Sequence, residues 1–107
     1  MPYDEQLDAR IGEVLAGLGT GRKKMFGGTC WLLNGNLLCG VFRDFLILRL
    51  GEAAAVAAST EPFVTPFDIT GRPMKGWVKV EKEGTGGRRL DYWLGLALAF
   101  VATLPPK

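Results

Sequence analysis

The sequence contains no histidine, so it lacks both the commonest general base and the commonest metal ligand of proteins. Its two cysteines, Cys30 and Cys39, cannot form a standard structural zinc site without histidine or further thiols. The chain also has no Walker loop, no Rossmann glycine pattern and no internal repeat. Because the sequence shows no catalytic constellation, we expect no enzyme, no cofactor and no bound metal.

The chain also lacks a marked excess of either charge and lacks a long apolar run. Its 13 basic and 11 acidic residues give a net charge of +2, whereas a protein built to neutralise nucleic-acid phosphates usually has a strong basic excess. The longest apolar run, Leu94 to Leu104, has about half the length that a membrane-spanning helix needs. No signal-peptide pattern opens the sequence, so we expect a cytoplasmic protein in a reducing compartment, with no membrane partner.

The 107 residues, 48% of them hydrophobic, predict a single domain, 1–107, with one core. The stretch from Asp4 to Leu18 has the pattern of an amphipathic helix. Its apolar positions recur at helical spacing: Leu7, Ile11, Val14, Leu15 and Leu18. Acidic residues in the first turns suit the positive end of the helix dipole, and we interpret the acidic outer face as solvated surface.

Three strands are predicted next, at Thr29–Leu33, Leu37–Phe42 and Phe45–Leu50. Between the first two, Asn34-Gly35 predicts a two-residue type I′ turn, which needs positive φ at both positions. This first hairpin is apolar on both faces, with Trp31, Leu33, Leu38 and Phe42 on one and Leu32, Leu37 and Val41 on the other. The second face therefore needs a cover, from this chain or from a second copy.

The second half predicts a helix over Glu52–Ser59, an irregular or edge strand over Phe63–Ile69, an alternating strand over Met74–Glu81 and a last helix over Leu90–Thr103. The order α-β-β-β-α-β-β-α predicts an α+β fold, with an antiparallel sheet of about five strands and helices mainly on one face. Alternation places six residues on the helix-covered face: Leu46, Leu48, Leu50, Met74, Val78 and Val80. In the last helix, Trp93, Leu96 and Phe100 widen the apolar stripe beyond what one sheet needs, which favours a homodimer.

The block Lys23-Lys24-Met25-Phe26-Gly27-Gly28 lies between the first helix and the first strand. As a functional site, its lysines and backbone N–H groups would bind an anion. We prefer the simpler interpretation of a helix–strand joint, with Met25 and Phe26 in the core and Lys23 and Lys24 in solvent. Glycine in loops usually serves turns, and the two glycines here permit a tight bend.

A second candidate site consists of Lys75, Trp77 and Lys79 on one strand face, to which Arg49 and Arg72 add further charge. Cations around an aromatic ring can stack bases and hold phosphates, or they can hold an acidic protein surface. The plainer interpretation is that Trp77 packs under a loop or helix while the lysines extend into water. The sequence leaves these interpretations open.

The two cysteines lie on either side of the predicted turn. If the Asn34-Gly35 loop has two residues, Cys30 faces Cys39 at a non-hydrogen-bonded position, with Cα atoms about 4.5–5.5 Å apart, within the range of a disulfide. We nevertheless expect free thiols, because the cytoplasm is reducing and neither cysteine has a thiolate-stabilising neighbour in the sequence. A redox switch is the alternative, and a three-residue loop would pair Trp31 with Cys39 instead.

Five blocks match a known family in order: Lys24-Met25-Phe26-Gly27-Gly28, Asn34-Gly35, Leu48-Arg49-Leu50, Thr70-Gly71-Arg72-Pro73-Met74-Lys75-Gly76-Trp77-Val78 and Leu104-Pro105-Pro106-Lys107. In these blocks the chain resembles the N-terminal domain of the TfoX/Sxy family over nearly its whole length. The resemblance implies an α+β fold like that of secretion chaperones, and kinship with regulators of natural competence, which act on transcription. Those regulators carry a second, C-terminal domain, whereas we expect a stand-alone N-terminal domain here.

The leading functional hypothesis is a non-enzymatic interaction or regulatory module that acts through a partner protein or through self-association. The doubly apolar hairpin, the wide stripe of the last helix and the family resemblance all support it. The alternative is a nucleic-acid-binding domain that uses the face of Lys75, Trp77 and Lys79. A third hypothesis, an enzyme, would need a pocket with two convergent polar or titratable groups.

Overall fold

The computed structural model describes residues 3–25, 27–68 and 73–107. The helices in these residues are α1 (Glu5–Leu15), α2 (Glu52–Ala58) and α3 (Arg89–Val101). The strands are β1 (Gly21–Met25), β2 (Gly28–Leu33), β3 (Asn36–Phe42), β4 (Phe45–Arg49), β5 (Val64–Asp68) and β6 (Pro73–Val80). A short 3-10 turn, η1 (Lys82–Gly84), leads toward α3.

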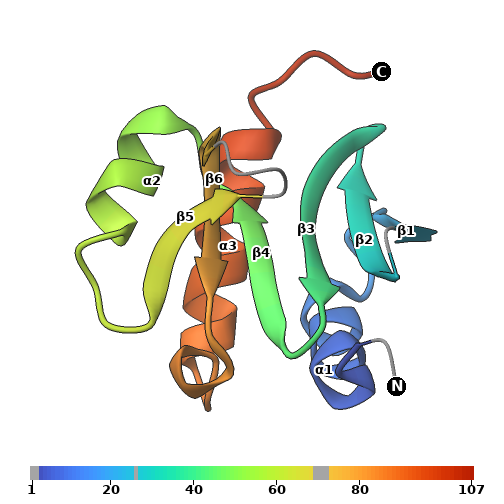
Figure 1. Ribbon diagram of the computed structural model, residues 1–107. Coiled ribbons are helices and arrows are strands. Elements are labelled where there is room, and N and C mark those ends of the chain that lie inside the picture. The colour runs from blue at the N-terminus through green and yellow to red at the C-terminus, as the bar shows by residue number, and fades with distance from the viewer. Residues whose placement is uncertain (1–2, 26, 69–72) are drawn as a thin grey trace.

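The strands form one antiparallel sheet in the order β1-β2-β3-β4-β6-β5. The chain leaves the sheet after β4 through α2, adds β5 at the far edge and returns as β6 between β5 and β4. Helices α1 and α3 lie on one side of the sheet, and α2 packs beside β5 and β6 (Figure 1). The predicted α+β architecture is confirmed, with one strand more than expected.

The extra strand is β1, and it shows that the predicted helix–strand joint is wrong. The block that contains Lys23 and Lys24 is an edge strand, paired with β2 along its whole length and followed by a tight turn. Gly27, in that turn, has a φ of 77°, which glycine adopts without strain. An edge strand with cationic side chains needs no apolar alternation, so the usual strand signal is missing. The side chain of Met25 and the whole of Phe26, both predicted to be in the core, lie outside the described part of the chain.

The predicted turn between β2 and β3 is confirmed. The φ angles of Asn34 and Gly35 are 55° and 82°, the two positive values that a type I′ turn requires. The end of the chain packs against this turn. The backbone N–H of Lys107 donates to the carbonyl of Asn34 at 2.8 Å, and the side-chain amide of Asn36 donates to the carbonyl of Pro105 at 2.9 Å. The last residues are thus fixed to the tip of the β2–β3 hairpin.

A β-bulge in β3 changes the predicted register of the cysteines. The strands are in the expected register beside the turn, but Trp31 pairs with Cys39, so Leu38 is an extra residue in β3. Cys30 then pairs with Gly40, and the predicted Cys30–Cys39 pair is wrong although the two-residue turn is right. Both thiols are free, as predicted. Because of the bulge, Leu38 and Cys39 both pack in the core.

A second irregularity, in β6, corrects the predicted position of Met74. Strands β5 and β6 pair unevenly around Gly76, because β6 has more residues than β5 between two consecutive pairs. Gly76 has a φ of 85°. This bend breaks the alternation on which the prediction depended, and Met74 lines the face of the sheet opposite α1 and α3. The other five residues predicted for the covered face are buried in the core: Leu46, Leu48, Leu50, Val78 and Val80.

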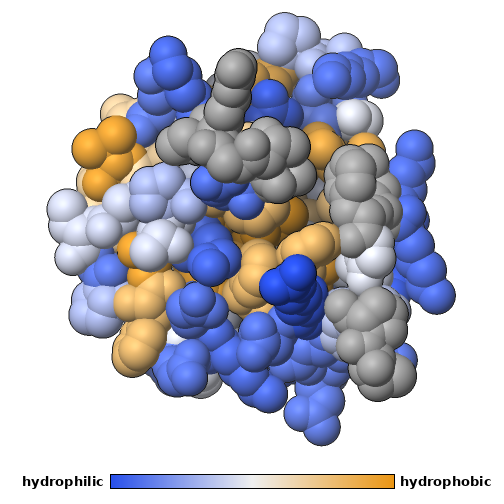
Figure 2. Space-filling view, viewed as in Figure 1, coloured by the Kyte–Doolittle hydropathy of each residue, from blue (hydrophilic) through white to orange (hydrophobic). Residues whose placement is uncertain are grey.

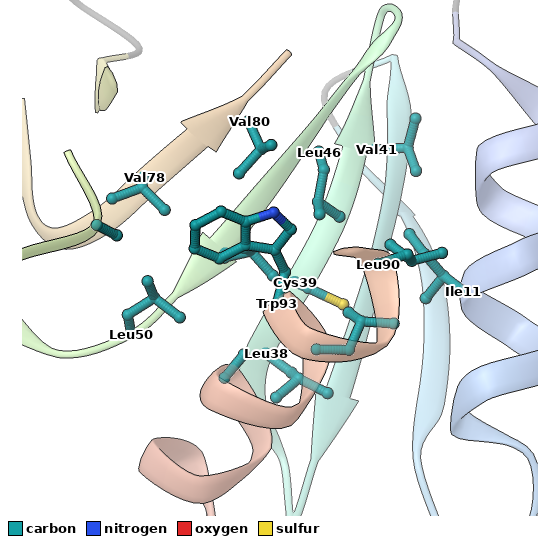
Figure 3. Close-up of a cluster of buried hydrophobic side chains, with 14 of the residues drawn as sticks. Ile11, Leu38, Cys39, Val41, Leu46, Leu50, Val78, Val80, Leu90 and Trp93 are labelled. Carbon is teal, nitrogen blue, oxygen red and sulfur yellow. The ribbon is translucent and has the colours of Figure 1, made fainter. Parts of the chain in front are cut away.

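Trp93 of α3 occupies the middle of the core, between the helix and the sheet (Figure 3). Its side chain is fully buried, and its indole N–H donates to the carbonyl of Gly84 at 3.1 Å. Further along α3, the ring of Phe100 packs against Gly51, where a Cβ atom would approach the ring to 2.7 Å. The wide apolar face of α3 is therefore used inside the molecule, and it does not itself require a second copy.

The close approach of β2 and β3 leads to a prediction about Gly40. A Cβ atom at Gly40 would overlap the backbone carbonyl oxygen of Thr29, whereas a Cβ atom at Gly95, on the exposed side of α3, would meet nothing within 4 Å. We expect Gly40→Ala to lower the free energy of unfolding by about 1–3 kcal/mol through overpacking. Gly95→Ala should instead raise it by about 0.5–1 kcal/mol, because alanine favours helix. Urea unfolding of both variants checks this, and a neutral Gly40→Ala would contradict the described packing of the two strands.

Candidate interaction surface

Alternation along β4 divides its side chains between two environments. Leu46 and Leu48 point toward the helices, and Phe45, Ile47 and Arg49 lie on the opposite side of the sheet. Among the described residues no helix covers that opposite side, which we call the open face (Figure 1). The sheet therefore has a second apolar face, as predicted, and nothing in the described chain packs over it as a helical layer. Val41 was predicted to lie on the face opposite Leu38, but both residues are buried in the core.

The open face carries a hollow of about 440 Å³. Figure 2 shows hydrophobic residues at the bottom of this depression and hydrophilic residues around it. Its apolar lining comes from β2, β3, β4, β5 and β6: Cys30, Leu37, Val41, Phe42, Phe45, Ile47, Pro66, Phe67, Met74 and Trp77. Arg43, Asp68 and Lys79 also line it. Thr29 borders it as well, although the Thr29 hydroxyl points to the other side of the sheet and donates to Asp8 of α1. A hollow of this size is typical of sites that receive a small molecule or the side chains of a partner.

Three phenylalanines from three strands support the floor of the hollow. The ring centroid of Phe45 lies 5.7 Å from that of Phe42 and 6.4 Å from that of Phe67, both in tilted geometry. Phe42 was predicted to share a face with Leu38, but the bulge in β3 separates them. The interlocked rings make the floor a preformed surface, since moving one ring would disturb its neighbours.

Three cations, Arg43, Arg49 and Lys79, stand beside the aromatic rings of the hollow; we call them the cationic rim. The guanidinium of Arg49 lies 5.9 Å from the ring centroid of Trp77, and that of Arg43 lies 5.7 Å from Phe42. The ammonium of Lys79 lies 4.8 Å from the centroid of Phe45, and 3.4 Å from a carboxylate oxygen of Glu81. The rim therefore presents positive charge directly next to apolar surface.

The candidate residues from the sequence are distributed unevenly around this site. Arg49, Trp77 and Lys79 come together on the open face, whereas Lys75 is exposed and outside the lining of the hollow. Arg72 lies outside the described residues. The two lysines of β1 lie on opposite faces of the sheet. Lys23 pairs with Cys30, which lies on the open face, and Lys24 pairs with Thr29, whose hydroxyl donates to Asp8 of α1.

A cluster around Asp8 was missed by the sequence analysis, which treated the acidic residues of α1 as solvated. The Asp8 carboxylate accepts hydrogen bonds from Arg22 at 2.6 and 3.1 Å, from the Thr29 hydroxyl at 2.7 Å and from the Trp31 indole at 3.2 Å. It therefore joins α1 to both β1 and β2. The signal was spacing, because Asp8 lies three residues before Ile11 and shares its buried helix stripe.

The surroundings of Asp8 keep its carboxyl group ionised. Burial alone would raise the pKa of Asp8, but the hydrogen bonds from Arg22, Thr29 and Trp31 outweigh it and hold the pKa below its ordinary value. With its oxygens engaged by these donors, Asp8 is suited to holding α1 in place rather than to moving protons.

The two thiols lie in different surroundings, with Cys30 beside the hollow and Cys39 in the core. Burial raises the pKa of both thiols, so neither is a thiolate at neutral pH and neither is a strong nucleophile. Within the described ranges, no three histidine, cysteine or carboxylate side chains group in a way that would hold a metal ion. In the same ranges, no helix is long and apolar enough to cross a membrane.

Comparison with known families gives one match. The model of the TfoX N-terminal domain matches residues 13–101, from the middle of α1 to the end of α3. The matched range contains the hollow, the cationic rim and the partners of Asp8 on β1 and β2. No curated protein and no solved structure gives a significant match.

The Asp8 cluster leads to a prediction about acid stability. A carboxyl group whose pKa is depressed in the folded state adds stability above its unfolded pKa, and this stability is lost as the pH falls through the folded pKa. At pH 7 we expect Asp8→Asn to lower the free energy of unfolding by about 2–4 kcal/mol, because Arg22 loses its charge partner. The difference from wild type should shrink as the pH falls below about 4.

Urea unfolding at several pH values measures this difference. Glu13→Gln is the matched control, since Glu13 is an exposed carboxylate on the same helix. An Asp8→Asn deficit that stays constant between neutral and acidic pH would contradict the charged hydrogen-bonded cluster.

Proposed function

The chain belongs to the TfoX N-terminal domain family, and on that premise we propose that it is a non-enzymatic interaction and regulatory module whose open face binds a partner protein. The observation that carries this proposal is the apolar hollow on a sheet face without a helical cover. Large apolar patches are rare on proteins that act alone, and they commonly mark binding surfaces. Cations beside the hollow add the polar rim that such surfaces usually have.

The chemistry of the hollow supports binding rather than catalysis. Its walls are mainly aromatic and aliphatic, and the thiol of Cys30 is kept protonated by burial. The lysine of the rim, Lys79, is already paired with Glu81. These groups do not form the hydrogen-bonded nucleophile and base that acyl or group transfer requires.

A nucleic-acid-binding domain is the second candidate, favoured by the guanidinium of Arg49 beside Trp77 and by Lys79 on the same strand. Stacked bases and phosphates use such groups. The near balance of charges over the whole chain weakens this candidate. Binding to random oligonucleotides at several salt concentrations separates the two, because phosphate contacts give an affinity that falls steeply with salt.

Self-association through the open face is a further form of the same proposal. One of its two original reasons is weakened, since Trp93, Leu96 and Phe100 of α3 pack within the molecule. The other reason, the apolar open face, remains. Light scattering at high concentration measures the oligomeric state directly.

Site-specific crosslinking tests whether the open face contacts a protein. We expect a photoreactive benzoylphenylalanine at Phe45, in the hollow, to give a protease-sensitive adduct in native lysate. The same group at Tyr92, an exposed aromatic residue of α3, should give none and is the matched control. An adduct with twice the mass of the chain would support the self-association form. Adducts sensitive only to nuclease, or equal yields at both positions, would contradict a protein-binding open face.

Truncation of Trp77 tests the wall of the hollow. We expect Trp77→Ala to leave the fold intact, because the side chain is only partly buried, and to reduce adduct formation from Phe45 roughly tenfold or more. We expect Lys75→Glu to weaken binding as well, since Lys75 is an exposed cation of the same strand. Thermal unfolding is measured on the same samples. A large loss of stability in Trp77→Ala would show that Trp77 serves packing instead.

A further inference from the structure

We propose that the hollow and its rim select an acidic protein segment with a single large apolar anchor, an inference that rests on the proposed function and names its partner chemistry. The anchor side chain enters the hollow, and carboxylates on both sides of the anchor meet Arg43 and Arg49. The segment belongs to another protein and lies along β4, across the middle of the open face.

The apolar part of the proposal follows from the floor of the hollow. Ile47 and Phe67 are only 9% and 5% exposed, so the hollow is a depression in packed side chains rather than a flat sheet surface. Its volume of about 440 Å³ accommodates an aromatic or large aliphatic side chain together with adjoining backbone. Burying one such side chain removes enough apolar surface from water to make it the anchor of a short segment.

The acidic part follows from the charge that is left on the rim. Within the described residues, the ion pairs involve Arg22, Lys79, Lys82 and Arg89. The guanidinium of Arg43 lies beside Phe42, and that of Arg49 lies beside Trp77 and donates to the carbonyl of Leu37 at 3.5 Å. Neither guanidinium forms an ion pair with a carboxylate of the described residues, although Asp68 also lines the hollow. A guanidinium matches a carboxylate with two parallel hydrogen bonds, which makes these arginines suitable partners for glutamate or aspartate.

The spacing of the two arginines sets the spacing of the acidic residues. Arg43 lies in the two-residue turn before β4, and Arg49 ends β4. The four steps from Phe45 to Arg49 span about 13 Å and the turn adds a few ångströms, so the two arginines lie roughly 16 Å apart along the strand. A segment in the polyproline II conformation rises about 3.1 Å per residue, and about every third side chain shares a face. Acidic residues three positions before and three positions after the anchor therefore span roughly 19 Å on the anchor's own side. The long arginine side chains cover the remaining few ångströms, so the two arginines predict an acidic–anchor–acidic pattern with that spacing.

The same charges disfavour the other occupants of the open face. A second copy placed by two-fold symmetry would bring the cationic rims of both copies onto one interface, with repulsion between like charges. A nucleic acid would satisfy the arginines, but its bases would meet an apolar depression with buried Ile47 and Phe67 at its floor instead of a flat, exposed aromatic platform.

A designed peptide tests the proposal on the full chain. The probe has about nine residues, with a central phenylalanine and a glutamate three positions to each side, and it carries a fluorophore for anisotropy. We expect saturable binding that weakens with added salt. Replacing the phenylalanine by alanine, or both glutamates by lysine, should weaken binding at least tenfold.

Charge reversals on the protein identify the docking position. We expect Arg49→Glu to weaken the peptide at least tenfold, and a peptide with lysine in place of one glutamate to regain affinity for this variant. Lys24→Glu is the matched control, since it changes the net charge equally but lies on the helix side of the sheet. Lys24 pairs with Thr29, whose hydroxyl donates to Asp8 of α1. Arg43→Glu is the second test variant, and it keeps the test decisive if Arg49→Glu does not fold.

Several outcomes would overturn the proposal. Equal weakening by Lys24→Glu and Arg49→Glu would show only a general attraction between charges. An unbound peptide, together with a protein adduct from Phe45, would refute the acidic-anchor chemistry while the proposed function stands. Failure of both the peptide and the adduct would remove the proposed function as well. A chain that is dimeric through the open face would replace the acidic segment by a second copy.

Discussion

Neighbouring side chains of a strand point to opposite faces of its sheet, and this constraint divides the protein into a closed side and an open side. β4 shows the division most clearly, because Leu46 and Leu48 are buried under helices while Phe45 and Ile47 line the hollow. Apolar residues at every second position would have sufficed for a sheet covered on one side. The chain has them at nearly every position of β4, so the helices account for only half of its apolar side chains.

Two departures from strict alternation decide which residues reach each side. The extra residue Leu38 places Cys39 in the core and Phe42 on the open face. The bend at Gly76 likewise places Met74 on the open face. Helix positions, the Asn34-Gly35 turn and the covered face of β4 were predictable, because each depends on short-range patterns. A bulge depends on how two distant strands settle against the same helices, so no local pattern identifies it.

The candidate surface was predictable only in part, for a related reason. Arg49, Trp77 and Lys79 were found because alternation on two strands exposes them together. The phenylalanines of the floor come from β3, β4 and β5. They come together only because β6 lies between β4 and β5 in the sheet, an order that the sequence does not reveal. The Asp8 cluster was missed because an acidic residue in a first helical turn normally faces water. Here three donors from neighbouring strands compensate its burial.

The contact between the end of the chain and the Asn34-Gly35 turn has a mechanical consequence. Two prolines stiffen the segment after α3, and hydrogen bonds tie its ends to the hairpin through Pro105 and Lys107. A pulling force applied at residue 107 is therefore delivered first to the tip of the β2–β3 hairpin, and reaches the last turn of α3 only after those two bonds break. These two bonds must therefore break before a force at residue 107 can begin to peel α3 from the core around Trp93.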